Sequence, residues 1–181
     1  MIRSGIWIRQ LFWKSEVLRI LFTTPSEGDQ ERRPASEPAM PAIFEWTHTV
    51  ADADLDGLGH ANNISYVKWM QSAALAHSAV QGWPVQAYSD LGCGWVVRSH
   101  FIEYLSPALH GDTIIVRTWV ADMKKVTSLR RYRIVTTRSD KEIILARAQT
   151  DWAFIDYGAG TPKRIPPEVS SSFEIAVVEE D

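Results

Sequence analysis

The stretch DLDGLGHANNISYVKW, residues 54–69, decides how this chain is interpreted. It places two carboxylates, a glycine-containing bend, one histidine and two asparagines directly before an apolar segment of helical character. The N-terminus of a helix presents N–H groups without partners and a partial positive charge, which can stabilise a developing oxyanion. A carboxylate beside such a terminus can attack an acyl carbon or activate water, so this stretch is a candidate catalytic segment.

The composition is that of one globular domain. The chain has 181 residues, which allows one domain with a substantial core and is short for two. Its net charge of −3 gives no basic field of the kind that nucleic-acid binding needs. The lone cysteine, Cys93, excludes an intrachain disulfide and indicates a reducing, cytoplasmic location. Between two glycines, this thiol is expected to be a small buried group rather than a nucleophile.

Residues 1–39 differ from the rest of the chain. Residues 1–25 mix basic and apolar side chains, whereas residues 26–39 are polar and contain proline, which is typical of a disordered linker. Charges interrupt every apolar run, so we expect neither an integral membrane segment nor a signal peptide, while a membrane-surface or transit-like segment stays open. A misassigned translation start before Met40 is equally compatible. We expect the folded domain over 40–170 and a C-terminal tail over 171–181.

The pattern after residue 40 predicts one strand, one helix and four long strands. The first strand spans 43–50, and the helix spans 63–80, with Asn62 or Asn63 as its cap and Gly82 and Pro84 ending it. Period-two segments follow at 95–105, 112–123, 126–137 and 142–155, and their short connections make neighbours antiparallel. In the last, Ile144 and every second residue to Phe154 are expected on one face. Apolar residues cover most of the helix circumference, which indicates a helix wrapped by other structure. We therefore predict an α+β fold, a curved antiparallel sheet of about five strands wrapped around one long central helix.

This element order and motif resemble the hot-dog fold thioesterases of the 4-hydroxybenzoyl-CoA thioesterase type, over about residues 43–167. Members often carry a run of the form D-x-D-x-x-G-H-x-N-N-x-x-Y. Asp54, Asp56, Gly59, His60, Asn62, Asn63 and Tyr66 stand at those positions here. The segment EYLSPALHGDTIIVRTWV, residues 103–120, also looks like the strand–turn–strand of the family.

The resemblance puts the catalytic carboxylate on Asp56. Plant acyl-carrier-protein thioesterases have a similar run, but their functional asparagine falls at Leu58 here, so that version of the site is not intact. Other hot-dog thioesterases place a glutamate on the central helix. That arrangement is closed to this chain, because no Asp or Glu occurs between Gly57 and Ser89. An aspartate before a glycine is also common simply because it suits a turn.

Further residues receive supporting roles. His60 either polarises the thioester or orients Asp56, or else hydrogen-bonds backbone and fixes the loop. Backbone N–H groups near Asn62 and Asn63 are the oxyanion candidates, and Gly59 lets the substrate approach them. Tyr66 is expected in the core or pocket wall. Lys124 and Lys125 are candidate cations for the phosphates of coenzyme A. The motif lacks the ligands of a metal site.

The predicted function is hydrolysis of an acyl-CoA thioester to the free acid and CoA. No metal or redox cofactor is expected. Coenzyme A enters the reaction as part of the substrate. The resemblance implies a homodimer or homotetramer with the site between subunits, and a sheet with open edges has a physical reason to pair. Two alternatives remain at this point: a thioesterase acting on acyl carrier protein, and a non-catalytic hot-dog module that binds acyl-CoA.

Overall fold

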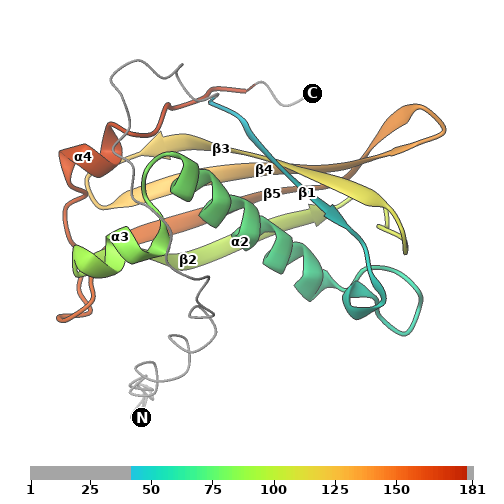
Figure 1. Cartoon of the computed structure of the whole chain (residues 1–181), viewed down its shortest axis with the longest axis horizontal. Coiled ribbons are helices and arrows are strands. Elements are labelled where there is room, and N and C mark those ends of the chain that lie inside the picture. The colour runs from blue at the N-terminus through green and yellow to red at the C-terminus, as the bar shows by residue number, and fades with distance from the viewer. Residues whose placement is uncertain (1–41, 179–181) are drawn as a thin grey trace, which may run out of the picture. The chain divides into compact units, whose positions relative to one another are not determined.

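Five antiparallel strands form one sheet in the computed structural model, which describes residues 42–178 (Figure 1). The predictions about residues 1–39 therefore lie outside the described residues. The strands lie in the spatial order β1 (Phe44–Thr49), β3 (Thr113–Met123), β4 (Thr127–Arg138), β5 (Lys141–Asp156) and β2 (Cys93–Tyr104). Every neighbouring pair is antiparallel, so the predicted α+β fold with five strands is confirmed.

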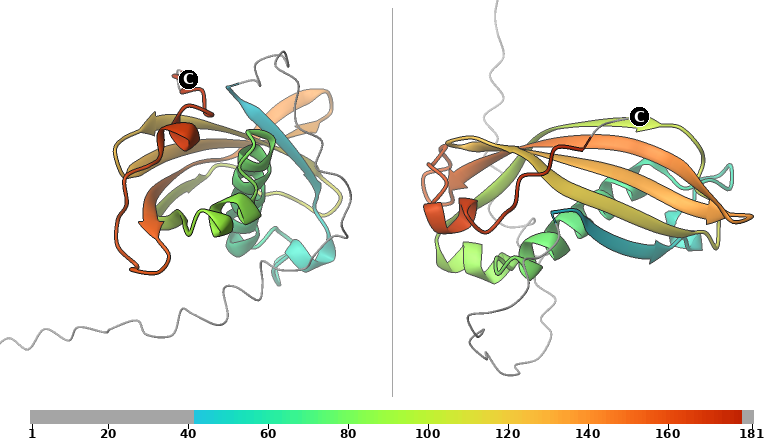
Figure 2. Two further views of the ribbon diagram at one scale, coloured as in Figure 1. Left: turned by 60° about the vertical axis from the view of Figure 1, so that its left-hand side comes forward. Right: turned by 90° about the horizontal axis from the view of Figure 1, so that it is seen from above.

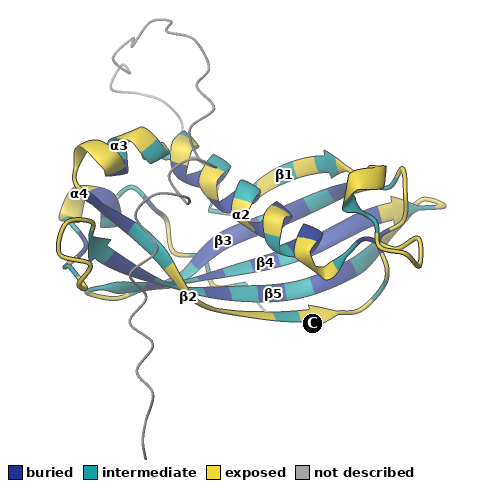
Figure 3. Ribbon diagram, turned by 90° about the horizontal axis from the view of Figure 1, so that it is seen from below, coloured by how far each residue is buried: buried dark blue, intermediate teal, exposed yellow. Residues whose placement is uncertain are grey.

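The long helix α2 (Asn63–Val80) lies across the concave face of this sheet (Figure 2). Its buried side chains recur at helical spacing and include Tyr66, Trp69, Met70, Ala73, Ala74 and His77. The opposite side of the helix is exposed: 62% of the Ile64 surface and 37% of the Leu75 surface are accessible (Figure 3). In the single chain, the sheet therefore wraps one side of the helix and leaves the other side exposed.

Within the described residues, the core has two apolar clusters. The larger one joins the first part of α2 to the centre of the sheet through Tyr66, Met70, Val116 and Ile134. The second lies under two short helices that the sequence did not predict, α3 (Val85–Asp90) and α4 (Pro167–Ser170), which contribute Tyr88 and Val169.

The chain continues to pack on the sheet beyond the predicted domain end at residue 170. Phe173 is buried in the second cluster, and the Ala176 N–H donates to the Val120 carbonyl over 3.0 Å. Residues 171–176 therefore belong to the folded domain rather than to a tail.

A register shift interrupts β5. Ile134 pairs with Ala146 and Val135 pairs with Ile144, so Leu145 has no partner on β4. Leu145 is buried in the larger cluster, and its carbonyl accepts the Leu105 N–H over 2.8 Å. This bulge breaks the predicted alternation at Ile144, while the buried residues Ala146, Ala148, Thr150 and Phe154 keep it.

Within residues 42–178, no helix is long and apolar enough to cross a membrane.

Candidate active site

The motif folds as a narrow hairpin between β1 and α2. The Asn62 N–H donates to the Asp54 carbonyl over 2.7 Å, and the Asp56 N–H donates to the His60 carbonyl over 2.8 Å. Gly59 closes the turn with a φ of 77°, which favours glycine because it has no side chain. The hairpin therefore presents Asp56 at its tip, across from the residues that lead into α2.

One oxygen of Asp56 fixes this turn. Oδ1 accepts the N–H of Leu58 over 2.8 Å and the N–H of His60 over 3.3 Å, an arrangement typical of aspartate in turns. Oδ2 accepts no hydrogen bond from any residue between 42 and 178, and the side chain is exposed. The turn role and an open carboxylate oxygen thus coexist in the same residue.

The N-terminus of α2 lies directly after the hairpin. Asn62 is its cap, since its side-chain oxygen accepts the Ile64 N–H over 2.9 Å and its carbonyl accepts the Ser65 N–H over 2.8 Å. Asn63 is the first helical residue, and its N–H donates to no group in the described part of the chain. A helix terminus with one unused N–H is suited to hold an oxyanion.

Asp54 joins the hairpin to β1, a link that sequence analysis missed. Its Oδ2 accepts Nε2 of His48 over 2.7 Å and the Ala51 N–H over 3.1 Å. Burial raises the pKa of the Asp54 carboxyl, but the His48 and Ala51 hydrogen bonds outweigh burial, so the pKa lies below its ordinary value. Asp54 is therefore ionised and held at neutral pH.

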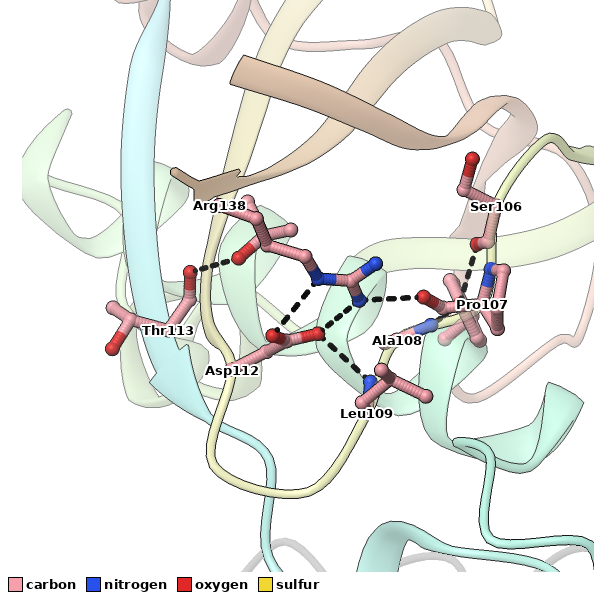
Figure 4. Close-up of polar contacts among 9 residues, drawn as sticks. Ser106, Pro107, Ala108, Leu109, Asp112, Thr113 and Arg138 are labelled. Atoms are coloured by element: carbon pink, nitrogen blue, oxygen red, sulfur yellow. Dashed lines mark hydrogen bonds and ion pairs between the residues drawn. The ribbon is translucent and has the colours of Figure 1, made fainter. Parts of the chain in front are cut away.

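A second loop, residues 105–112 between β2 and β3, is held by its own polar contacts (Figure 4). Arg138, at the end of β4, pairs with both oxygens of Asp112 and donates to the Pro107 carbonyl over 2.8 Å. Asp112 also accepts the Leu109 N–H over 2.8 Å. The hydrogen bond from Arg138 holds the pKa of Asp112 below its usual range.

Tyr66 connects this loop to α2. Its ring is buried, and its hydroxyl oxygen accepts the Ala108 N–H over 3.1 Å. The Ala61 N–H donates to the Ala108 carbonyl over 2.9 Å, and His60 forms an isolated bridge with Leu109. The structure thus places Tyr66 under the hairpin as a core support and leaves His60 exposed at its surface.

Exposed apolar residues surround the hairpin. Leu58, at its tip, is 82% exposed, and Ile64 and Leu109 stand beside it on α2 and on the second loop. A further exposed set lies on the edge strand β2, where Phe101 is 64% exposed (Figure 3). Such a surface is typical of a binding site or of an interface between proteins.

Lys124 and Lys125 lie in the turn between β3 and β4, at the other end of the sheet. The hairpin adjoins the start of β3, since the Val50 N–H donates to the Asp112 carbonyl over 2.9 Å. The 11 residues of β3 separate the two ends by roughly 30 Å or more. Within one chain, the structure does not bring these lysines to Asp56.

The described residues contain no group of three or more His, Cys, Asp or Glu side chains placed to hold a metal ion. The sequence profile of the thioesterase-like superfamily matches residues 50–173, which span the hairpin, α2 and the strands β2 to β5. The chain belongs to this superfamily. It is a hot-dog thioester hydrolase, as the motif and element order predicted.

Solved hot-dog thioesterases share the fold of this superfamily member. A 1,4-dihydroxy-2-naphthoyl-CoA thioesterase from Synechocystis is 21% identical with a TM-score of 0.65, over 72% of this chain and 94% of that one. A DHNA-CoA thioesterase from Staphylococcus aureus is 19% identical with a TM-score of 0.63, over 67% and 80%. A mutant 4-hydroxybenzoyl CoA thioesterase complexed with 4-hydroxybenzoyl CoA is 15% identical with a TM-score of 0.68, over 74% and 100%. At these identities the likeness shows the fold alone.

Proposed function

We propose that this thioesterase hydrolyses acyl-CoA, with water as the second substrate and the free acid and CoA as products. Asp56 supplies the reacting carboxylate, the N-terminus of α2 stabilises the oxyanion, and His60 supports Asp56. Coenzyme A is part of the substrate, and the reaction uses no further cofactor. The observation that carries this proposal is the open Oδ2 of Asp56 in the hairpin that leads directly into a helix terminus with an unused N–H.

Oδ2 can act in either of two ways. As a nucleophile, it attacks the thioester carbon, CoA leaves as the thiolate, and water then cleaves the resulting anhydride. As a general base, it takes a proton from water, which attacks the same carbon. Fixation of Oδ1 by two backbone N–H groups keeps the carboxylate oriented in both cases. A single turnover in ¹⁸O-labelled water separates the two, because only the anhydride route can transfer label to Asp56.

The Asn63 N–H is the donor that we assign to the developing oxyanion. It lies at the positive end of the 18-residue helix α2, where the partial charge of the helix adds to the hydrogen bond. Asn62 acts as the helix cap. Its side chain accepts the Ile64 N–H, and the Asn63 N–H stays available at the helix terminus. Gly59 and Leu58 form the wall over which the acyl group approaches.

The active form in this proposal is a homodimer that pairs along β2, with a tetramer as a further level of assembly. β2 is an edge strand, and most of its residues from 98 to 104 are exposed. An exposed strand edge of this length is a template for pairing with another strand. The second copy would also cover the exposed face of α2, where Ile64 and Leu75 lie.

Such a dimer gives Lys124 and Lys125 a role. Thr127, which begins the strand after these lysines, pairs with Ala153, which in turn pairs with Val96 near the start of β2. Tyr66, beneath the hairpin, contacts Tyr104 at the end of β2 with ring centroids 5.1 Å apart. Antiparallel pairing of two β2 strands therefore brings the lysine end of one subunit toward the hairpin end of the other. We assign the lysines to the phosphates of CoA bound at the neighbouring subunit's hairpin.

The test is an assay of the full chain with a thiol-reactive dye against aliphatic acyl-CoAs, 4-hydroxybenzoyl-CoA and 1,4-dihydroxy-2-naphthoyl-CoA. A matched arm offers the same acyl groups on acyl carrier protein. Release of CoA, with kcat/KM at least ten-fold above the carrier-protein arm, supports the proposal. Preference for the carrier-protein arm makes the protein a biosynthetic acyl-carrier thioesterase. Binding of acyl-CoA without turnover makes it a non-catalytic module.

A further inference from the structure

We propose that His48 is a positioning residue for this site, because it holds the Asp54 carboxylate and thereby fixes the hairpin that carries Asp56. The catalytic part of this inference rests on the proposed function. His48 lies on β1, outside the motif, and the motif itself gives it no role. Its contacts connect three elements of the fold at one point.

Two aromatic contacts hold the His48 ring in one orientation, independently of its hydrogen bond. It stacks on Trp46 of the same strand, with ring centroids 5.6 Å apart and planes 7° from parallel. Trp69 of α2 also packs against it, with centroids 5.7 Å apart and planes 43° apart. A ring fixed by two indoles loses little further freedom when Nε2 donates to Asp54, so the bond acts as a rigid link.

Asp54 transmits this link through two different groups. Its carboxylate accepts the hydrogen bond from Nε2 of His48 over 2.7 Å on the β1 side. Its carbonyl receives the Asn62 N–H over 2.7 Å and the Ser65 hydroxyl over 3.1 Å on the helix side. One residue therefore sets the distance between the end of β1, the base of the hairpin and the first turn of α2. The base of the hairpin in turn sets the positions of Asp56 and of the Asn63 N–H, which is the oxyanion donor.

Backbone contacts also hold the hairpin within residues 42–178. The Ala61 N–H donates to the Ala108 carbonyl, and at the base the Asp54 and Leu55 N–H groups donate to the carbonyls of Ala51 and Asp52 in the preceding turn. Loss of the His48 bond would remove the side-chain link from β1 to this base, and Asp56 could then swing relative to the helix terminus. Displacements of about 1 Å at a reacting group can cost a hundred-fold in rate.

The chain provides a matched control nearby. His110 Nε2 lies 3.3 Å from Oδ1 of Asp52, so the same pair of residue types occurs next to the same hairpin. Both of these side chains are mostly exposed, however, and neither carries a hydrogen bond to the hairpin in the described structure. Such an exposed pair contributes little, so its loss should leave the hairpin unchanged.

The experiment compares His48→Phe, His48→Gln and His110→Gln in the full chain. Phenylalanine keeps the stacked ring and removes the donor, whereas glutamine keeps a donor near the position of Nε2. Two readouts are taken: kcat and KM on the best acyl-CoA, and hydrogen exchange of the Asn62 amide. We expect His48→Phe to lower kcat at least ten-fold with KM within two-fold, and to speed Asn62 exchange at least ten-fold. His48→Gln should recover most of both, and His110→Gln should match the wild type.

Wild-type kcat and wild-type exchange at Asn62 in His48→Phe would overturn the inference, as would a loss of global stability with unchanged kcat. If His48→Phe does not fold, Asp54→Asn replaces it, since asparagine keeps an acceptor and removes the charge. We then expect a smaller fall in kcat and a smaller rise in Asn62 exchange. The absence of both changes overturns the inference. A wild-type protein that releases no CoA removes the proposed function instead. In that case the exchange rate of Asn62 still decides whether His48 fixes the hairpin.

Discussion

Nη1 of Arg130 lies 2.8 Å from Nδ1 of His77, between β4 and α2 in the interior of the protein. The Arg130 side chain is buried, and its Nη1 also donates to the Thr118 hydroxyl over 3.2 Å. His77 must accept from the guanidinium and is therefore neutral. Burial and the neighbouring Arg130 charge lower the pKa of His77 to about 3.

This pair predicts acid sensitivity of the fold. The unfolded chain takes up a proton on His77 near pH 6.5, whereas the folded protein resists protonation until about pH 3. Between those values the unfolded state binds more protons, so the free energy of unfolding falls as the pH falls, by on the order of 5 kcal/mol from this residue. Urea unfolding at pH 7, 5.5 and 4 measures it. His77→Asn keeps an acceptor and should flatten the slope, while His110→Gln should not; equal slopes in all three proteins would refute the assignment.

Replacement of Arg138 by glutamine tests the second loop. It removes the ion pair with Asp112 and the hydrogen bond to Pro107, and we expect a loss of about 1–3 kcal/mol of stability together with a lower kcat. Arg117→Gln is the control, since Arg117 has the same 28% side-chain exposure and is also paired with carboxylates, away from the hairpin. Chemical denaturation and steady-state kinetics measure both. An equal effect of the two substitutions on kcat would show that the loop does not support the site.

The dimer predicts that a charge on the β2 edge separates the subunits. Phe101→Lys places a cation on an exposed position of this strand, which disfavours strand pairing. We expect a monomer by light scattering and at least a hundred-fold lower activity. Val177→Lys, at another exposed apolar position outside the strands, serves as the control. A fully active monomer would contradict the shared site.

The lysine assignment predicts an effect on binding rather than on chemistry. The double variant Lys124→Ala, Lys125→Ala should raise KM for acyl-CoA several-fold, leave kcat unchanged, and lose its effect at high salt. It should not alter KM for the matching acyl-pantetheine thioester, which lacks the nucleotide phosphates. Lys163→Ala is the control, since Lys163 pairs with Asp156 over 3.2 Å much as Lys124 pairs with Asp122 over 3.4 Å. A KM change that is the same for both substrate types would remove the lysines from phosphate binding.

The fold could be predicted because its signals are local. The α2 range of 63–80 follows from the asparagine cap, the uninterrupted helix formers and Gly82, and the structure has the same range. The strands also lie within two residues of their predicted bounds. The short helix α3 was missed because six residues after Pro84 show no period of their own, and the bulge at Leu145 was missed because it depends on the register with β4.

The site could be predicted only in part. The motif located the glycine-containing bend and the Asn62 cap. His48 was overlooked because its contact with Asp54 depends on how the chain bends after β1, and no local pattern reports that bend. The same limit applies to Lys124 and Lys125, since only the length of β3 shows how far from the hairpin they lie in one chain.

The most direct test of the central claim is the kcat of Asp56→Asn. Asparagine keeps an oxygen that can accept the Leu58 and His60 N–H groups, so the turn should survive while the carboxylate is lost. Asp52→Asn, at a fully exposed aspartate before the same hairpin, is the matched control. We expect kcat on the best acyl-CoA to fall by about 10²–10⁴-fold in Asp56→Asn, a loss typical of a removed acid–base group, and to stay unchanged in Asp52→Asn. Equal CoA release by Asp56→Asn and the wild type would show that Asp56 serves the turn alone and that the catalytic group lies elsewhere.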